Sequence, residues 1–254
     1  MLDDIEHFYS LKEFPNLQEE LNWKRNEIKR KGLLFHVIHA LDSYCRGAKN
    51  ILDVGGGSGV NLALYGREIN CSELYCVDSR EPDEKIPGIH YVRAPVEKLS
   101  ALNLPRFDCV VMTEVIEHLF DPDEAIEQIR DVMKNNGILI LTTPNLSAMI
   151  NIFTLLFDYQ PVDTEVSTSR TYGRPFIRNG ETVGHIRVFT FRALEEIIEY
   201  HNFRILHAGT VGRITSSKYK SSVPIRLADF VDRLSSRLIK FGGSRSYVVA
   251  QKKE

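Results

Sequence analysis

The feature that most constrains the fold is an alternation of short apolar runs with longer helical runs between residues 48 and 143. Strands separated by helices of about 10–15 residues are typical of βαβ units, in which helices cover both faces of a parallel sheet. We expect strands at 50–54, 74–78, 89–93, 107–112 and 138–143, with helices near 59–69 and 122–134. Asn136-Gly137 is expected to supply the turn into the last of these strands.

Further regular segments lie on both sides of this alternation. Residues 16–46 have apolar residues at helical spacing, with Gly32 as a break between two helices. Towards the end of the chain the pattern predicts a helix at 191–200, a strand at 203–211, a helix at 225–241 and a strand at 246–250. We therefore predict an α/β fold, Rossmann-like, with a seven-stranded and mostly parallel sheet covered by helices on both faces.

Two parts of the chain are expected to stand apart from this sheet. Residues 1–47 would form an N-terminal helical extension, and 48–254 the main domain. Inside that domain, a segment at about 158–187 is polar and has no sustained period. A stretch of this length without regular structure is usually a lid or a binding loop, so we predict an inserted lid there.

Composition limits the class of protein. The 254 residues are 43% hydrophobic and 26% charged, which is enough to build a sizeable core. No apolar stretch approaches the roughly 20 residues of a spanning helix, and the first residues lack the order of a signal peptide, so we expect a cytoplasmic protein. The four cysteines form no CxxC pair and are expected to be buried thiols.

The loop after the first predicted strand suggests the ligand. Gly55, Gly57 and Gly59 allow tight turns and close approach of a ligand, and the helix that follows points its amides at a negative group. Asp78 ends the second strand, where an acid can accept hydrogen bonds from ribose hydroxyls. Asp53 would repel a pyrophosphate, but it suits the ammonium and sulfonium of S-adenosylmethionine. The spacing also departs from the dinucleotide pattern G-x-G-x-x-G.

With these residues in view, the chain resembles the class I S-adenosylmethionine-dependent methyltransferases, in particular the branch with the ubiquinone-biosynthesis O-methyltransferases. The resemblance covers about residues 48–210. It is carried by LDVGGGSG (52–59), CVD (76–78), FDCVVMTEVIEHLFDPDEAI (107–126), NNGILILTTPN (135–145) and GHIRVFTFRALEEIIEYHNF (184–203).

The resemblance assigns roles to the cofactor-binding residues. It implies Asp53 and the backbone of Gly55, Gly57 and Gly59 for the methionine part, and Asp78 for the ribose. Where family members often place an aspartate for the adenine, this chain has Pro95, so the backbone of Val96 or the side chain of Glu97 would serve. Ser79 and Thr113 complete the expected set.

The segment Thr113-Glu114-Val115-Ile116-Glu117-His118 is the expected catalytic region. In a helical turn, Glu114, Glu117 and His118 would share one face. One hypothesis makes His118 a general base, with Glu117 beside it. A second has Glu114, Glu117, His118 and His185 hold a divalent metal, since similar segments are metal ligands in RNA 3′-end methyltransferases. A third gives these residues a structural role.

Two further predicted helices have apolar sides that could contact the acceptor or a membrane. The segment 148–157 is almost wholly apolar; we favour a buried core helix, although a greasy acceptor would also suit it. The C-terminal helix has Arg226, Arg233, Arg237 and Lys240 near one face and apolar residues near another. We favour docking of its apolar face on the sheet, with contact to an anionic membrane as the alternative.

We therefore expect a methyltransferase that uses S-adenosylmethionine, with a divalent metal as a possible second cofactor. The expected acceptor is an oxygen, or less favoured a nitrogen, of a small or lipid-linked metabolite such as a sugar, a quinone or a cell-envelope precursor. The alternatives are a metal-dependent RNA 2′-O-methyltransferase, against which the mild net charge of -2 argues, and a non-catalytic regulatory protein that binds S-adenosylmethionine. The sequence does not predict an oligomeric state.

Overall fold

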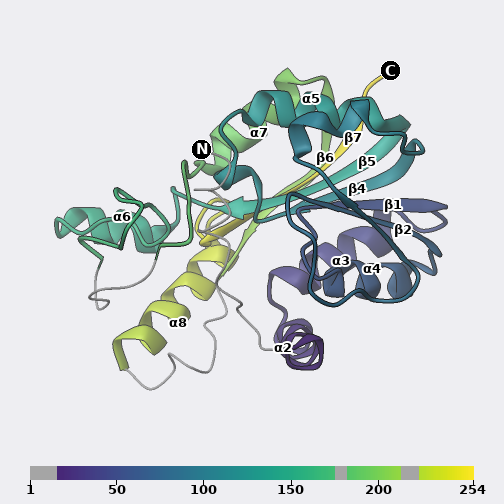
Figure 1. Ribbon diagram of the computed structural model, residues 1–254. Helices are drawn as coiled ribbons and strands as arrows, with labels where there is room; N and C mark the ends of the chain where they lie inside the picture. Colours follow the sequence, from purple (N-terminus) through teal and green to yellow (C-terminus); the bar gives the residue numbers. More distant parts are fainter. Residues whose placement is uncertain (1–15, 175–181, 213–222) are drawn as a thin grey trace.

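The computed structural model describes residues 16–174, 182–212 and 223–254, and Figure 1 shows their arrangement. Parts of the predicted extension (1–15) and insertion (175–181) lie outside the described residues. The helices are α2 (Leu17–Lys29), α3 (Leu33–Tyr44), α4 (Val60–Ile69), α5 (Pro122–Val132), α6 (Met149–Leu156), α7 (Phe191–Tyr200) and α8 (Val223–Leu238), with 3-10 helices η1 (Val96–Ala101) and η2 (Ile116–His118). The strands are β1 (Asn50–Val54), β2 (Glu73–Asp78), β3 (Ile89–Arg93), β4 (Phe107–Thr113), β5 (Met133–Pro144), β6 (Phe203–Val211) and β7 (Arg245–Lys252).

The described strands form one seven-stranded sheet in the order β3-β2-β1-β4-β5-β7-β6. Neighbouring strands from β3 to β5 pair in parallel, whereas β7 runs antiparallel to both β5 and β6. The predicted Rossmann-like and mostly parallel sheet is therefore confirmed. Because parallel strands end at the same edge, the loops after β1, β2, β4 and β5 meet there, and β7 begins there.

Helices cover both faces of the sheet, as Figure 1 shows for α5 and α7 on one side and α3 and α4 on the other. Each layer has its own core. The α5 and α7 side buries residues such as Ile126 and Leu194, and the α3 and α4 side buries residues such as Leu41 and Leu62. β1 is buried along its whole length, which is typical of a central strand in a doubly covered sheet.

Most predicted element boundaries are confirmed to within a few residues, including the break between α2 and α3. β5 begins at Met133, five residues before the predicted strand. Its pairing with β4 nevertheless jumps from Met133 to Ile138, and Asn136 between them has φ 60°. The predicted turn at Asn136-Gly137 is therefore an irregularity within β5, and the regular ladder begins at Ile138 as expected. All four cysteines are free and buried, as expected.

The prediction of a buried core helix at 148–157 is wrong. α6 forms, but it extends away from the sheet (Figure 1). Leu156 and Phe157 are 72% and 73% exposed, whereas the buried residues of α6 are Asn151 and Thr154. Local polar contacts explain this orientation: Asn151 donates to the Asn145 carbonyl and accepts from the Val162 N–H.

The preferred docking of the C-terminal helix is also wrong. Leu227, Phe230 and Leu238 of α8 are exposed, while Asp232 and Ser235 are buried. Asp232 accepts from the Ser244 hydroxyl, and Ser235 donates to the carbonyls of Asp232 and Gly242. Its polar side therefore meets the body of the protein. Among the described helices, none combines the length and hydropathy that a membrane crossing requires.

Candidate functional site

The Asp53 carboxylate lies buried at the end of β1. The residue is 1% exposed, and neither carboxylate oxygen has a hydrogen-bond partner among the described residues. Burial, together with the nearby Asp78 charge, raises the pKa of Asp53 to about 8, and Lys24 opposes this shift. A buried carboxylate without donors is costly, so a cation or a hydrogen-bond donor placed beside Asp53 would stabilise it.

The glycine loop follows directly, and its backbone requires glycine. Gly55, Gly57 and Gly59 have φ of 69°, 53° and 79°, the left-handed region that other residues seldom adopt. A side chain at Gly55 would collide with Val115, and one at Gly59 would collide with Tyr91. At Gly57 there is open space instead, which leaves its backbone accessible to a ligand. The loop ends at Gly59, and α4 begins at Val60.

The Asp78 carboxylate lies against this loop. One oxygen accepts from the Gly57 N–H at 3.0 Å and the other from the Arg80 N–H at 2.9 Å, with the Ser79 hydroxyl at 3.5 Å. A hollow beside it is lined by Cys76, Asp78, Arg80, Glu81, Pro82, Tyr91, Val92 and Arg93. The structure thus brings together the predicted methionine and ribose positions.

The remaining predicted cofactor residues lie at the same edge of the sheet. The Ala94 N–H donates to the Asp78 carbonyl, and two residues later Val96 begins η1 with its side chain buried. Glu97 follows in a half-buried position. Thr113 ends β4, two strands away from β2. Their contacts with a cofactor stay predictions.

Contrary to the prediction, Glu114 does not share a face with Glu117 and His118. It has φ 55°, and only the single turn η2 follows it, so no continuous helix aligns the three side chains. The Glu114 carboxylate instead accepts from the Thr142 hydroxyl at 3.0 Å and pairs with the Arg245 guanidinium at 2.7 Å. We therefore exclude Glu114 from the cluster that Glu117 forms.

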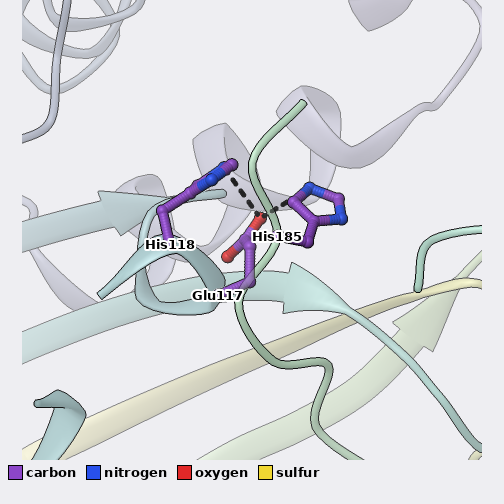
Figure 2. Close-up of side chains that lie close together, drawn as sticks. All are labelled: Glu117, His118 and His185. Carbon is purple, nitrogen blue, oxygen red and sulfur yellow. Dashed lines mark ion pairs between the residues drawn. The ribbon is translucent and has the colours of Figure 1, made fainter. Parts of the chain in front are cut away.

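Glu117, His118 and His185 converge, as Figure 2 shows. The Nε2 atoms of both histidines lie 3.9 Å from Glu117 Oε1. Glu117 is fully buried; its Oε2 accepts from the Thr143 hydroxyl, whereas Oε1 has no hydrogen-bond partner among the described residues. Burial and the Glu114 charge raise the pKa of Glu117 well above its usual range. Burial and His185 lower the pKa of His118 to about 4, so that imidazole is neutral at pH 7.

Backbone carbonyls orient both imidazoles. His118 Nδ1 lies 3.0 Å from the Gly184 carbonyl, and His185 Nδ1 lies 2.6 Å from the Asp163 carbonyl. A carbonyl can only accept, so Nδ1 carries a proton in each ring, and in the neutral ring of His118 the lone pair is on Nε2. Both Nε2 atoms face the side on which Glu117 Oε1 lies, and ligand atoms of the three residues lie within 4.8 Å of one another.

Comparison with known proteins identifies the family of the chain. A family model described as a methyltransferase domain matches residues 25–208. The chain belongs to this methyltransferase family. It is 25% identical over 145 residues to a ubiquinone biosynthesis O-methyltransferase of Psychrobacter cryohalolentis, a match that covers 54% of this chain and 56% of that protein. The chain thus spans only about half the length of the curated relatives it matches.

Solved structures show the same methyltransferase fold. A SAM-dependent methyltransferase from Archaeoglobus fulgidus superposes with a TM-score of 0.53 at 22% identity, covering 91% of this chain and 99% of the other. The plantazolicin methyltransferase BpumL in complex with SAH gives 0.57 at 13% identity, covering 100% and 95%. The resemblance to class I S-adenosylmethionine-dependent methyltransferases is thus confirmed in family and fold.

The candidate site also contains residues that the sequence did not indicate. Arg245, at the start of β7, pairs with Glu114 and also with Asp163 at 2.8 Å. Burial alone would lower the pKa of Arg245, but Asp163 and Glu114 outweigh it and raise the pKa further. Glu165 accepts from three successive N–H groups, those of Val183, Gly184 and His185. No motif marks these contacts, because they join segments distant in sequence.

Proposed function

We propose that this methyltransferase binds S-adenosylmethionine in the loop between β1 and α4 and transfers its methyl group to an acceptor beside η2. The observation that carries the proposal is the buried Asp53 carboxylate, for which the described residues supply no hydrogen-bond donor. An ammonium group satisfies such a carboxylate, whereas a pyrophosphate would be repelled by it. When bound, the donor supplies an electrophilic methyl group on a positively charged sulfur.

Each predicted cofactor residue has a role in this proposal. Asp53 and the accessible backbone at Gly57 would hold the methionine part, and Asp78 with Ser79 the ribose. Val96 and Glu97 would meet the adenine, with Thr113 on the side of β4. The hydrogen bond from the Gly57 N–H to the Asp78 carboxylate supports this assignment, because it places a carboxylate beside the open space at Gly57.

His118 would accept the proton of an acceptor hydroxyl. Its ring is neutral at pH 7, and the Gly184 carbonyl holds the proton on Nδ1, so Nε2 is the basic nitrogen. The lowered pKa makes His118 a weak base, which suits a hydroxyl that becomes acidic only as its oxygen bonds to carbon. Glu117 lies beside His118 and, with its raised pKa, can hold a proton. These features favour an oxygen acceptor over a nitrogen.

The acceptor would be a small or lipid-linked metabolite such as a sugar, a quinone or a cell-envelope precursor. The similarity to ubiquinone biosynthesis O-methyltransferases supports a phenolic or quinone-like hydroxyl, although it covers only half of each chain. The expected cytoplasmic location stays a prediction.

A divalent metal at Glu117, His118 and His185 is the second candidate role for this cluster. It is favoured by one observation: both imidazoles turn Nε2 towards Glu117 Oε1, while each Nδ1 meets a backbone carbonyl. Metal-binding histidines are commonly fixed in this way through the second nitrogen. Bound there, a metal ion would lower the pKa of an acceptor hydroxyl. Metal dependence would also revive the alternative of an RNA 2′-O-methyltransferase.

Calorimetry tests the proposal. Titration with S-adenosylmethionine should show binding, and titration with a nicotinamide dinucleotide should not; the reverse result would contradict it. Formation of S-adenosylhomocysteine is then measured with a panel of catechols, phenols and sugars as acceptors. Binding without turnover on every acceptor, together with unchanged biological function in His118→Ala, would favour the non-catalytic alternative.

A further inference from the structure

Two of the four cysteine side chains contact each other, although they lie 64 positions apart in the chain. Cys45 Sγ lies 2.9 Å from Cys109 Sγ. Cys45 is the C-cap of α3, and Cys109 belongs to β4, the central strand of the sheet. Both side chains are buried in the core layer on the α3 and α4 side. The contact therefore joins the N-terminal helices to the middle of the sheet.

The other two thiols have a different kind of partner. Cys71 Sγ lies 3.3 Å from the Lys49 carbonyl oxygen, and Cys76 Sγ lies 3.9 Å from the Gly57 carbonyl oxygen. A thiol is a weak donor, and both contacts suit a thiol that donates to a backbone carbonyl. The two sulfur atoms of Cys45 and Cys109 lie closer together than either of these pairs, although sulfur is a larger atom than oxygen.

A metal ion between the two sulfur atoms does not fit this distance. A zinc–thiolate bond is about 2.3 Å long, so two thiolates on one tetrahedral zinc ion lie about 3.7 Å apart. Cys45 and Cys109 are closer than that, and among the described residues they belong to no group of three possible ligands within 4.8 Å. A disulfide bond is about 2.0 Å long, so an approach of about 0.9 Å would form it. The geometry therefore favours a covalent bond between the two sulfur atoms.

We propose that Cys45 and Cys109 are an oxidisable pair that forms a disulfide bond when the protein meets hydrogen peroxide. In the first step the peroxide transfers one oxygen to the Cys45 sulfur, which gives a sulfenic acid and one water. In the second step the Cys109 sulfur attacks the Cys45 sulfur, the S–S bond forms, the S–O bond breaks and a second water leaves. Two thiols and one peroxide thus give one disulfide and two waters, and two electrons pass from sulfur to the peroxide.

Cys45 is expected to react first because it lies nearer to the protein surface. It follows the last turn of α3 and precedes a turn at residues 46–47, whereas Cys109 lies in a strand that is paired on both sides. Burial, together with the Cys45 contact, raises the pKa of the Cys109 thiol well above its usual range, so Cys109 is a poor first nucleophile. Helix ends open more readily than core strands, and peroxide is small enough to reach Cys45 in that way.

The disulfide would close a loop of the chain that contains β1, the glycine loop, α4, β2 and β3. A cross-link over a long loop restricts the unfolded chain and thereby raises the stability of the folded protein. Cys109 lies near the start of β4, whereas Glu117 and His118 follow the end of that strand. The cross-link therefore leaves the candidate site untouched and does not depend on the proposed function.

The experiment treats the full chain with hydrogen peroxide and maps disulfides by mass spectrometry after digestion with trypsin without a reductant. Cys45 lies in the expected peptide 32–46 and Cys109 in 107–130, whereas Cys71 and Cys76 share the peptide 68–80. The expected product links 32–46 to 107–130, and the free thiols fall from four to two. Cys109→Ala should give no linked peptide. Cys71→Ala is the matched control and should still give the link between 32–46 and 107–130.

A thermal melt supplies the second measurement. Peroxide should raise the melting temperature of the wild type by about 5 °C or more, and dithiothreitol should reverse the rise. Cys109→Ala should show no such rise, and its melt before treatment shows that it folds; Cys45→Ala serves in its place if it does not.

Three results would overturn the proposal: four free thiols after peroxide, a link from 32–46 to 68–80 instead, or Cys45 oxidised to a sulfinic acid without a cross-link. Calorimetry with S-adenosylmethionine on the reduced protein tests the proposed function separately, because donor binding needs no disulfide.

Discussion

The Asp78 carboxylate accepts a hydrogen bond from the Gly57 N–H at 3.0 Å, which joins the end of β2 to the glycine loop. This contact brings a second carboxylate near Asp53, and the Asp78 charge contributes to the raised pKa of Asp53. Two acidic groups at one loop are unfavourable in the absence of a ligand, and a ligand with positive charge relieves the repulsion. On the proposed function, the site gives up some stability for donor binding.

Asp53→Asn should change binding and stability in opposite directions. Loss of the charged partner should weaken S-adenosylmethionine binding by about 10- to 100-fold, since a hydrogen bond to a charged group contributes about 1.5–3 kcal/mol. The free energy of unfolding of the ligand-free protein should stay equal or rise, because a buried carboxylate without a partner is removed. Calorimetry and urea unfolding measure the two effects. Asp131→Asn, at an exposed position, serves as control. Equal S-adenosylmethionine binding by wild type and Asp53→Asn would contradict the proposed role of Asp53 in donor binding.

The raised pKa of Asp53 also predicts a pH dependence of stability. Between its unfolded value of 3.8 and its folded value of about 8, the folded protein keeps a proton that the unfolded chain has lost. The contribution of Asp53 to the free energy of unfolding of the ligand-free protein is therefore highest below pH 4. It falls as pH rises towards 8, by up to about 1.4 kcal/mol per pH unit. Urea unfolding at pH 5 to 8 should show a steeper loss in wild type than in Asp53→Asn.

The same titration predicts proton release on donor binding. At pH 7 the ligand-free Asp53 is largely protonated, and an ammonium group beside it favours the carboxylate. Calorimetry in buffers of different ionisation enthalpy should therefore show up to one proton released per donor bound. The release should disappear in Asp53→Asn. Proton uptake in wild type would contradict the assignment.

The sequence was sufficient to predict the sheet and the glycine loop, because both depend on local signals. Strand runs, the glycines and the acids at strand ends are contiguous in the chain, and β1 and β3 have the expected bounds. The inverted helices were not predictable in the same way. Amphipathic spacing shows that α8 has two faces, but which one turns inwards depends on Asp232 and Ser235 finding partners in the segment 242–244.

The candidate site was predictable only in part for the same reason. The E-x-x-E-H spacing pointed to Glu117 and His118, but it wrongly grouped Glu114 with them, since a left-handed residue interrupts the helix. Glu114 pairs with Arg245, which lies 131 positions later in the chain. His185 bonds to the carbonyl of Asp163, which lies 22 positions earlier. Such contacts follow from the tertiary fold and not from any local pattern.

Zinc titration should distinguish the two hypotheses for the cluster. If it holds a metal, calorimetry of the wild type should show one strong site, and His185→Ala should lower the affinity by at least tenfold, since one of its three ligands is lost. His39→Ala is the control, because His39 is an exposed histidine outside the cluster. Equal zinc binding by wild type and His185→Ala would exclude the metal hypothesis and leave His118 as a base without a metal.

Arg245 is expected to determine the tautomer of His185. It pairs with the Asp163 side chain, and the Asp163 carbonyl holds the Nδ1 proton of His185. Lysine keeps the charge at 245 but cannot bridge Asp163 and Glu114 as a guanidinium does, so Asp163 should lose its fixed position in Arg245→Lys. Nitrogen NMR of the imidazoles should then show His185 changing from the Nδ1–H form to a mixture with the Nε2–H form. Arg187→Lys should leave that signal unchanged, because Arg187 donates to the Phe120 carbonyl. An unaltered His185 signal in both Arg245→Lys and Asp163→Asn would show that Arg245 only holds the fold together.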